Sequence, residues 1–146
     1  MYQRVLVPLD GSELAECALS HVRSLVKAGS VGKVTLLHII RIDVPGAHID
    51  LSGFRELAFA SGNKYLAEME SRLVSAGVKV KTEVLEANWT ASSITEYAEK
   101  NGIDLIVMST HGYTGFKRMM LGSVAHGVLN QSPVPVLLIR PEACRL

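Results

Sequence analysis

Short apolar runs alternate along the chain with longer segments whose hydrophobic residues have helical spacing. Residues 5–7, 34–40 and 105–108 are nearly unbroken apolar runs. Such runs are typical of parallel strands that helices cover on both faces. Alternation of strand-like and helix-like segments over the whole length is the pattern of βαβ units. The sequence therefore predicts an α/β fold built on a doubly wound, mostly parallel sheet.

Four helices are expected between these strands. The first has Ser12 and Glu13 at its N-terminus, where capping and the helix dipole favour them. The second lies within residues 54–76, and the fourth begins near Ser123. Residues 43–53 are expected to form the one long connection, and their sequence indicates no particular chemical function. The apolar stripe of the first helix is formed by Leu14, Cys17, Ala18, His21, Val22 and Leu25, while Ile94, Tyr97 and Ala98 mark the third helix.

Two segments have the properties of edge strands. Between residues 78 and 84, apolar side chains alternate with lysine and glutamate, which leaves one face of the strand near water. The last run, from Val134 to Ile139, contains Pro135, which cannot donate a backbone hydrogen bond and is tolerated mainly at an edge. An exposed apolar edge favours pairing. We therefore expect a homodimer in which this last strand meets its copy.

Composition narrows the class of protein. The 146 residues suffice for one domain, residues 1–146, and 48% of them are hydrophobic, so a packed core is expected. Lys plus Arg number 15 against 14 for Asp plus Glu, which gives no electrostatic reason for binding nucleic acid or an anionic membrane surface. No signal peptide and no membrane-spanning run is visible, so a soluble cytoplasmic protein is expected. Cys17 and Cys144 show no metal-ligand spacing, and the sequence predicts no disulfide framework.

Two segments follow strands and contain residues that could bind a ligand. In an open parallel sheet, ligands bind beyond the carboxyl ends of the strands. The first segment runs from Pro8 through Leu9 and Asp10 to Ser12, before a helix N-terminus. Asp-Gly-Ser is also ordinary turn chemistry, so this segment alone decides nothing.

The second segment, residues 108–124, is more specific. Three glycines, several hydroxyl groups and the adjacent cations Lys117 and Arg118 come before the fourth helix. Backbone N–H groups, hydroxyls and the helix dipole could together bind a phosphate. The alternative is a glycine-rich connection that turns the chain and binds nothing. His38, in a buried strand, is interpreted as a core histidine, whereas His111 lies inside this second segment.

These motifs resemble a universal stress protein domain over essentially the whole chain. The resemblance is carried by Val-Pro-Leu-Asp-Gly-Ser near the start, by Ser-Thr-His-Gly-x9-Gly-Ser and by Pro-Val-Pro-Val-Leu-Leu-Ile near the end. It implies a five-stranded parallel sheet of order 3-2-1-4-5 with helices on both faces. ATP-binding members of that family carry Gly-x2-Gly-x9-Gly followed by Ser or Thr. Gly112, Gly122 and Ser123 match that motif, while Ser109 stands where its first glycine is expected.

The resemblance also implies the composition of a nucleotide site. Pro8 and Asp10 would line its adenosine side, the backbone of Ile39 would meet the adenine edge, and Met108 would pack near the base or ribose. The candidate ligand-binding residues are then Pro8, Leu9, Asp10, Ser12, Ile39, Met108, Ser109, His111, Gly112, Gly122, Ser123 and Val124.

We thus expect an ATP-binding, dimeric stress-response regulatory protein with a protein partner, in which Mg²⁺ could bridge the ATP phosphates. The P-loop motif is absent and no acid pair would hold a metal, so the sequence predicts neither catalytic residues nor metal ligands, and at most slow ATP hydrolysis. One alternative is a nucleotide-free dimeric interaction module of the same fold. Another is a hydrolase in which Asp10, Ser12 and His111 act together.

Overall fold

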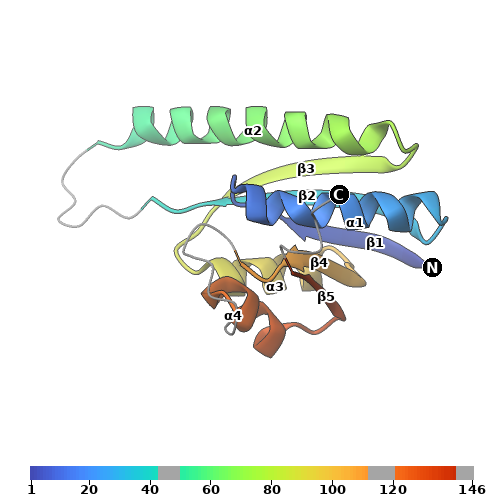
Figure 1. Ribbon diagram of the computed structural model, residues 1–146. Coiled ribbons are helices and arrows are strands. Elements are labelled where there is room, and N and C mark those ends of the chain that lie inside the picture. The colour runs from blue at the N-terminus through green and yellow to red at the C-terminus, as the bar shows by residue number, and fades with distance from the viewer. Residues whose placement is uncertain (43–49, 112–120, 141–146) are drawn as a thin grey trace.

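The computed structural model describes residues 1–42, 50–111 and 121–140 (Figure 1). Five parallel strands form one sheet of order β3-β2-β1-β4-β5, which confirms the predicted fold class and strand order. The elements in chain order are β1 (Tyr2–Pro8), α1 (Glu13–Lys27), β2 (Val31–Ile40), α2 (Ser52–Val74), β3 (Lys79–Glu86), α3 (Thr90–Lys100), β4 (Leu105–Ser109), α4 (Ser123–Gln131) and β5 (Val136–Ile139).

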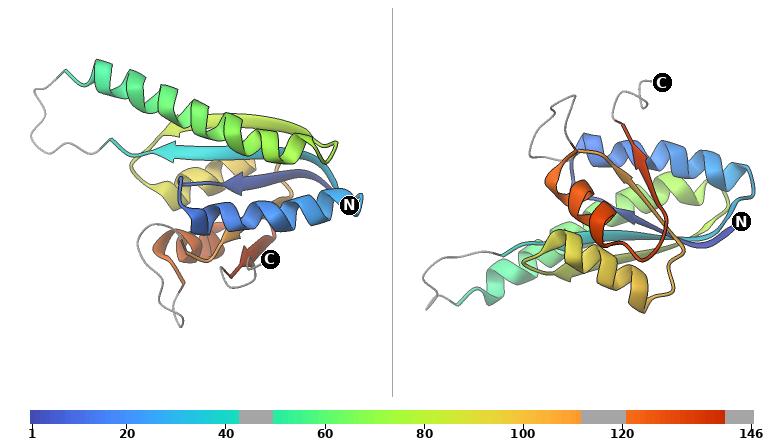
Figure 2. Two further views of the ribbon diagram at one scale, coloured as in Figure 1. Left: turned by 45° about the horizontal axis from the view of Figure 1, so that its top comes forward. Right: turned by 90° about the horizontal axis from the view of Figure 1, so that it is seen from below.

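Helices cover both faces of the sheet. α1 and α2 pack on one face, and α3 and α4 pack on the other (Figures 1 and 2). Because successive side chains of a strand point to opposite faces, Val5 and Val7 join the core under α1 and α2, whereas Leu6 joins the core under α3 and α4. The interior strands are therefore apolar on both sides, as their unbroken runs predicted.

The predicted edge strands are the edges of the sheet. β3 has half-buried and exposed residues throughout, while Val5, Leu6 and Val7 of central β1 are fully buried. β5 lies at the opposite edge, beside β4. Its Leu137 is 38% exposed, whereas Val136 and Leu138 pack against the core under α3 and α4.

Two helix predictions need correction. On α1, Ser12 is the N-cap as predicted, but Ala15 and Leu19 are buried while Leu14 and His21 are only half-buried. The predicted helical period was right, but the buried side of the helix is rotated from the predicted stripe toward Ala15 and Leu19. The connection after β2 ends at residue 51 rather than 53, because α2 begins at Ser52. The Asp50 carboxylate accepts the Ser52 N–H at 3.0 Å and starts the helix early.

Two further findings concern predictions from composition. Cys17, on the sheet-facing side of α1, is disulfide-bonded, which the spacing of cysteines along the chain did not indicate. In the part of the chain that the structure describes, no helix has the length and hydropathy needed to cross a bilayer.

Candidate functional site

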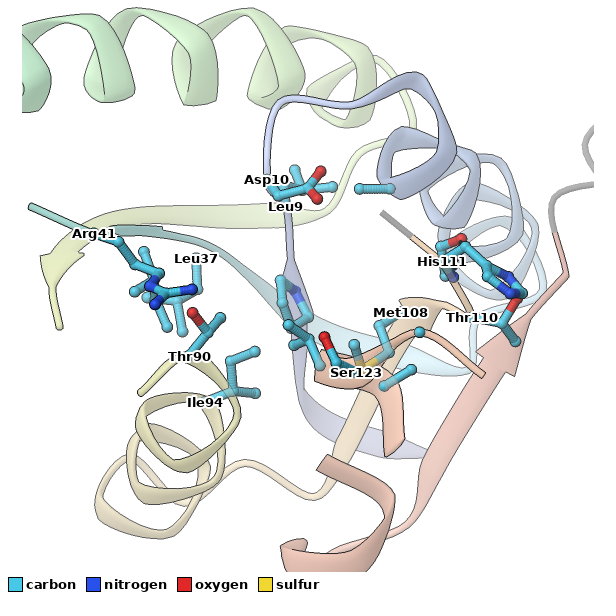
Figure 3. Close-up of a pocket in the computed structure, with 17 residues that line it drawn as sticks. Leu9, Asp10, Leu37, Arg41, Thr90, Ile94, Met108, Thr110, His111 and Ser123 are labelled. Carbon is cyan, nitrogen blue, oxygen red and sulfur yellow. Dashed lines mark hydrogen bonds between the residues drawn. The ribbon is translucent and has the colours of Figure 1, made fainter. Parts of the chain in front are cut away.

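A cavity of about 300 Å³ opens at the carboxyl ends of the strands (Figure 3). Its walls come from the ends of β1, β2 and β4 and from the N-terminal parts of α1, α3 and α4. The chain leaves β1 toward β2 on one side, and β4 lies on the other, so this is the point where strand order reverses. Such a point is where open α/β sheets bind ligands.

The structure brings most of the predicted site residues together at this cavity. Ser12 does not line it, because its side chain is buried as the cap of α1. Gly112 lies outside the described residues, as do Lys117 and Arg118. The predicted residues that line the cavity are Pro8, Leu9, Asp10, Ile39, Met108, Ser109, His111, Gly122, Ser123 and Val124.

Sequence reasoning missed one end of the cavity. Arg41, Thr90 and Ile94 line it beside Leu37, and Figure 3 shows the Arg41 guanidinium directed toward the Thr90 hydroxyl. Arg41 directly follows β2, and Thr90 begins α3 directly after the connection from β3. Because the carboxyl ends of parallel strands meet at one edge of a sheet, these positions were a signal in the sequence, but one that can be interpreted only together with the strand order.

The β1–α1 turn is held by hydrogen bonds among its own side chains. Asp10 Oδ1 accepts the Ser12 N–H at 2.9 Å and the Ser12 hydroxyl at 2.5 Å. Ser12 Oγ in turn accepts the Ala15 N–H at 3.0 Å. Gly11 turns the chain with a φ of 87°, which glycine adopts without steric cost. The turn therefore fixes the exposed Asp10 side chain at the cavity wall.

The N-terminus of α4 forms the opposite wall. Gly122 donates its N–H to the Thr110 carbonyl at 2.8 Å, and a Cβ on Gly122 would lie only 2.9 Å from the same oxygen. No described side chain caps the helix, and Ser123 is exposed at its first position. Helix N-termini carry unsatisfied N–H groups and partial positive charge, so this wall suits an anion.

The end of β2 presents backbone groups to the cavity. Leu9 donates its N–H to Leu37 at 2.8 Å, and Ala87 donates to Ile40 at 3.0 Å. In a parallel ladder, alternate residues bond to opposite neighbours, so the Ile39 N–H and C=O point to the β1 side. β1 ends at Pro8, and no bond joins the Ile39 backbone to the described turn that follows. One donor and one acceptor are therefore directed at the cavity.

The buried polar residues at the end of β4 and directly after it form hydrogen bonds with one another. The Thr110 hydroxyl and His111 Nδ1 are 2.8 Å apart, and Ser109 Oγ accepts the His111 N–H at 3.4 Å. In the described chain the Ser12 hydroxyl bonds only to Asp10 and to the N–H of Ala15. Ser12 is a helix cap rather than an activated nucleophile, which is evidence against a hydrolase built from Asp10, Ser12 and His111.

Among the residues that the structure describes, no cluster of three or more His, Cys, Asp or Glu side chains is arranged to hold an ion. The chemistry that the cavity offers is hydrogen bonding, apolar contact and attraction of an anion.

Comparison with known proteins gives consistent matches over nearly the whole chain. The model of the universal stress protein family matches residues 1–140. Universal stress protein MJ0577 of Methanocaldococcus jannaschii is 32% identical over an alignment of 158 positions, gaps included, that covers 96% of this chain and 96% of that protein. The solved structure of MJ0577 superposes with a TM-score of 0.78 at 34% identity, covering 96% of each chain.

Two more distant structures share the fold and hold nucleotides. A universal stress protein in complex with cAMP superposes with a TM-score of 0.70 at 22% identity, covering 96% of this chain and 98% of its own. A protein of the same family from Arabidopsis thaliana, with AMP bound, superposes with a TM-score of 0.69 at 17% identity, covering 94% and 91%. At these identities the likeness is one of fold.

Proposed function

The chain belongs to the universal stress protein family, and we propose that it is a regulatory protein that binds an adenine nucleotide, ATP in the first instance, in the cavity at the carboxyl ends of β1, β2 and β4. The observation that carries this proposal is that the two ends of one cavity match the two parts of a nucleotide, its phosphates and its base. The N-terminus of α4 suits phosphate, and the end of β2 offers a donor beside an acceptor.

The backbone of Ile39 favours adenine as the base. Adenine presents an acceptor, N1, beside a donor, the 6-amino group. The Ile39 N–H and C=O can pair with both, since each backbone residue carries one donor and one acceptor. Leu37, Ile94 and Met108 supply apolar surface for the ring. The cAMP and AMP complexes of distant relatives are consistent with this choice.

The phosphates would lie against Gly122 and Ser123. The absence of a side chain at Gly122 lets the N-terminus of α4 lie close to the Thr110 carbonyl, where a Cβ would be only 2.9 Å away, and the Ser123 hydroxyl can donate to a phosphate oxygen. If Mg²⁺ accompanies ATP, its ligands would be phosphate oxygens and water rather than a cluster of the described side chains. We propose no dedicated enzymatic activity for the site.

The proposed assembly is a cytoplasmic homodimer through β5. The Val136–Ile139 strand is a sheet edge with an exposed Leu137, and unpaired apolar edges favour association. A nucleotide-dependent protein partner would complete the regulatory role. A nucleotide-free dimeric module is the second candidate, favoured by Ser109, which lines the cavity and stands where the family motif has its first glycine.

Thermal unfolding with and without nucleotide tests the proposal. The protein is first unfolded, stripped of small molecules and refolded, and then melted with ATP and Mg²⁺. A ligand that binds only the folded state, at 100 times its Kd, adds about 2.7 kcal/mol to the free energy of unfolding. Inorganic triphosphate and GTP are the controls for the phosphate chain and the base. A melting temperature that ATP leaves unchanged at millimolar concentration would reject nucleotide binding in favour of the interaction module.

A further inference from the structure

His38 immediately precedes Ile39 on β2, and its imidazole crosses to the turn after β1. The distance from His38 Nδ1 to the Leu9 carbonyl oxygen is 2.7 Å. A carbonyl oxygen can only accept a hydrogen bond, so Nδ1 is the protonated ring nitrogen. The sequence interpretation of His38 as a satisfied core histidine is therefore incomplete, because the residue that satisfies it forms part of the cavity wall.

The bond to His38 replaces a bond that the sheet would otherwise make. The register pairs Val7 with Leu36 and Pro8 with Leu37, and the Leu9 N–H bonds to the Leu37 carbonyl at 2.8 Å. The next rung of a parallel ladder would join the Ile39 N–H to the Leu9 carbonyl. Within the described chain that rung is not formed, and the Leu9 carbonyl accepts from the imidazole instead.

We propose that His38 is a positioning residue of the nucleotide site: by holding the Leu9 carbonyl, it ends the β1–β2 ladder one rung early and leaves the Ile39 N–H facing the cavity to bind the base. This inference rests on the proposed function, since it assigns the freed N–H to the ligand. His38 does not touch the ligand and acts through the backbone of its neighbour.

The packing of α2 fixes the imidazole in the orientation that this role requires. The Tyr65 ring meets the His38 ring edge to face, with centroids 5.6 Å apart and an interplanar angle of 61°. Gly62 is buried above the imidazole, where a Cβ would lie 3.1 Å from His38 Cδ2 and 3.2 Å from the Val84 methyl groups. A helix on the face of the sheet away from α3 and α4 thus restrains the side chain that opens the base end of the cavity.

A matched pair of substitutions separates the hydrogen bond from the volume of the side chain. Asparagine and leucine have nearly the same shape, but only asparagine places an N–H donor near the position of Nδ1. His38→Asn should therefore keep the Leu9 carbonyl engaged. His38→Leu should release that carbonyl, and the Ile39 N–H should then complete the ladder.

Amide hydrogen exchange at Ile39, measured without ligand, reads the ladder directly. We expect fast exchange in the parent and in His38→Asn, and slowed exchange in His38→Leu. Calorimetric titration reads the consequence. His38→Leu should bind ATP about fivefold more weakly than the parent, the equivalent of about 1 kcal/mol for one lost hydrogen bond, while His38→Asn stays close to the parent.

Inorganic triphosphate is the control ligand because it lacks a base. Its affinity should be the same in all three proteins, whereas general damage to the fold would weaken both ligands equally and would overturn the inference. An Ile39 amide that exchanges as fast in His38→Leu as in the parent, with unchanged ATP affinity, would also overturn it while the proposed function stood. If the parent itself binds no ATP, the proposed function is wrong, and with it the role assigned to His38.

Discussion

Substitution of Gly122 by alanine tests how closely α4 must approach β4. Gly122 has a φ of −59°, which any residue can adopt, so backbone strain is not the reason for glycine. The added Cβ would lie 2.9 Å from the Thr110 carbonyl oxygen and 3.4 Å from His111 Cα. Both are backbone atoms that cannot rotate away, and Gly122 also donates its own N–H to that carbonyl at 2.8 Å. The substitution must therefore push the helix N-terminus outward.

The expected cost follows from two opposing effects. Overpacking of this kind costs about 1–3 kcal/mol. Replacement of glycine by alanine returns about 0.4–1 kcal/mol, since the unfolded chain loses conformational freedom. The net loss in the free energy of unfolding is then about 1–2 kcal/mol, which lowers the melting temperature of a domain of this size by roughly 3–8 °C.

Calorimetric melting without nucleotide measures this loss, with Gly53→Ala as the matched control. A Cβ on Gly53, in the first turn of α2, meets nothing within 4 Å, so Gly53→Ala should melt at or above the parent temperature. Because the displaced wall also carries the proposed phosphate contacts, Gly122→Ala should weaken ATP at least about tenfold and adenosine less. Melting and ATP binding that both match the parent would refute the close approach and the phosphate assignment together.

The other predictions concern the edge strand, the first turn and a buried phenol. Leu137→Lys should shift the protein toward monomer in sedimentation, and a parent that is already monomeric would contradict the proposed dimer. Leu137 is chosen because it is exposed, whereas Val136 packs against the core. Asp10→Ala should lower the free energy of unfolding in urea by about 1–2 kcal/mol, since Asp10 Oδ1 accepts two hydrogen bonds from Ser12. It should also weaken ATP binding more than Asp10→Asn does. Lower stability with unchanged ATP affinity would mean that Asp10 has only a structural role. Burial, and then the charge of Glu16, raise the pKa of Tyr65, so the unfolded chain loses this proton first and stability should fall as pH rises above about 10. In Tyr65→Phe the free energy of unfolding, measured in urea at pH 8 and pH 11, should decrease less between the two pH values than it does in the parent. An equal decrease in both proteins would contradict this prediction.

Local patterns in the sequence were sufficient to predict the α/β class and the parallel sheet, whereas the strand order was predicted from the resemblance to universal stress proteins. Unbroken apolar runs identified the interior strands, and alternation identified β3 as an edge. Ser12 was correctly predicted as a cap, because capping depends only on a few neighbouring residues. The buried stripe of α1 was shifted in phase, since which side of a helix meets a sheet depends on the packing of both.

The site was less predictable, because its residues come from strands that are distant in sequence. The cavity wall formed by Arg41 and Thr90 becomes apparent only when the order of strands is known. Ser12 was expected to face the ligand, but a hydroxyl already bound to Asp10 and to a helix N–H is buried in the turn. The open backbone of Ile39 depends on a tertiary hydrogen bond between His38 and Leu9, which no local pattern indicates.

Backbone amide NMR during a titration with ATP tests the central claim most directly, because it reports both ends of the cavity at once. In the stripped parent protein, we expect the amide resonances of Ile39 at the base end and of Ser123 at the phosphate end to shift together and to saturate with one Kd. The Leu137 amide, on the sheet edge, should stay in place apart from any change in dimerisation. Saturating ATP that leaves Ile39 and Ser123 unshifted, or that shifts only residues elsewhere, would contradict a nucleotide site in this cavity.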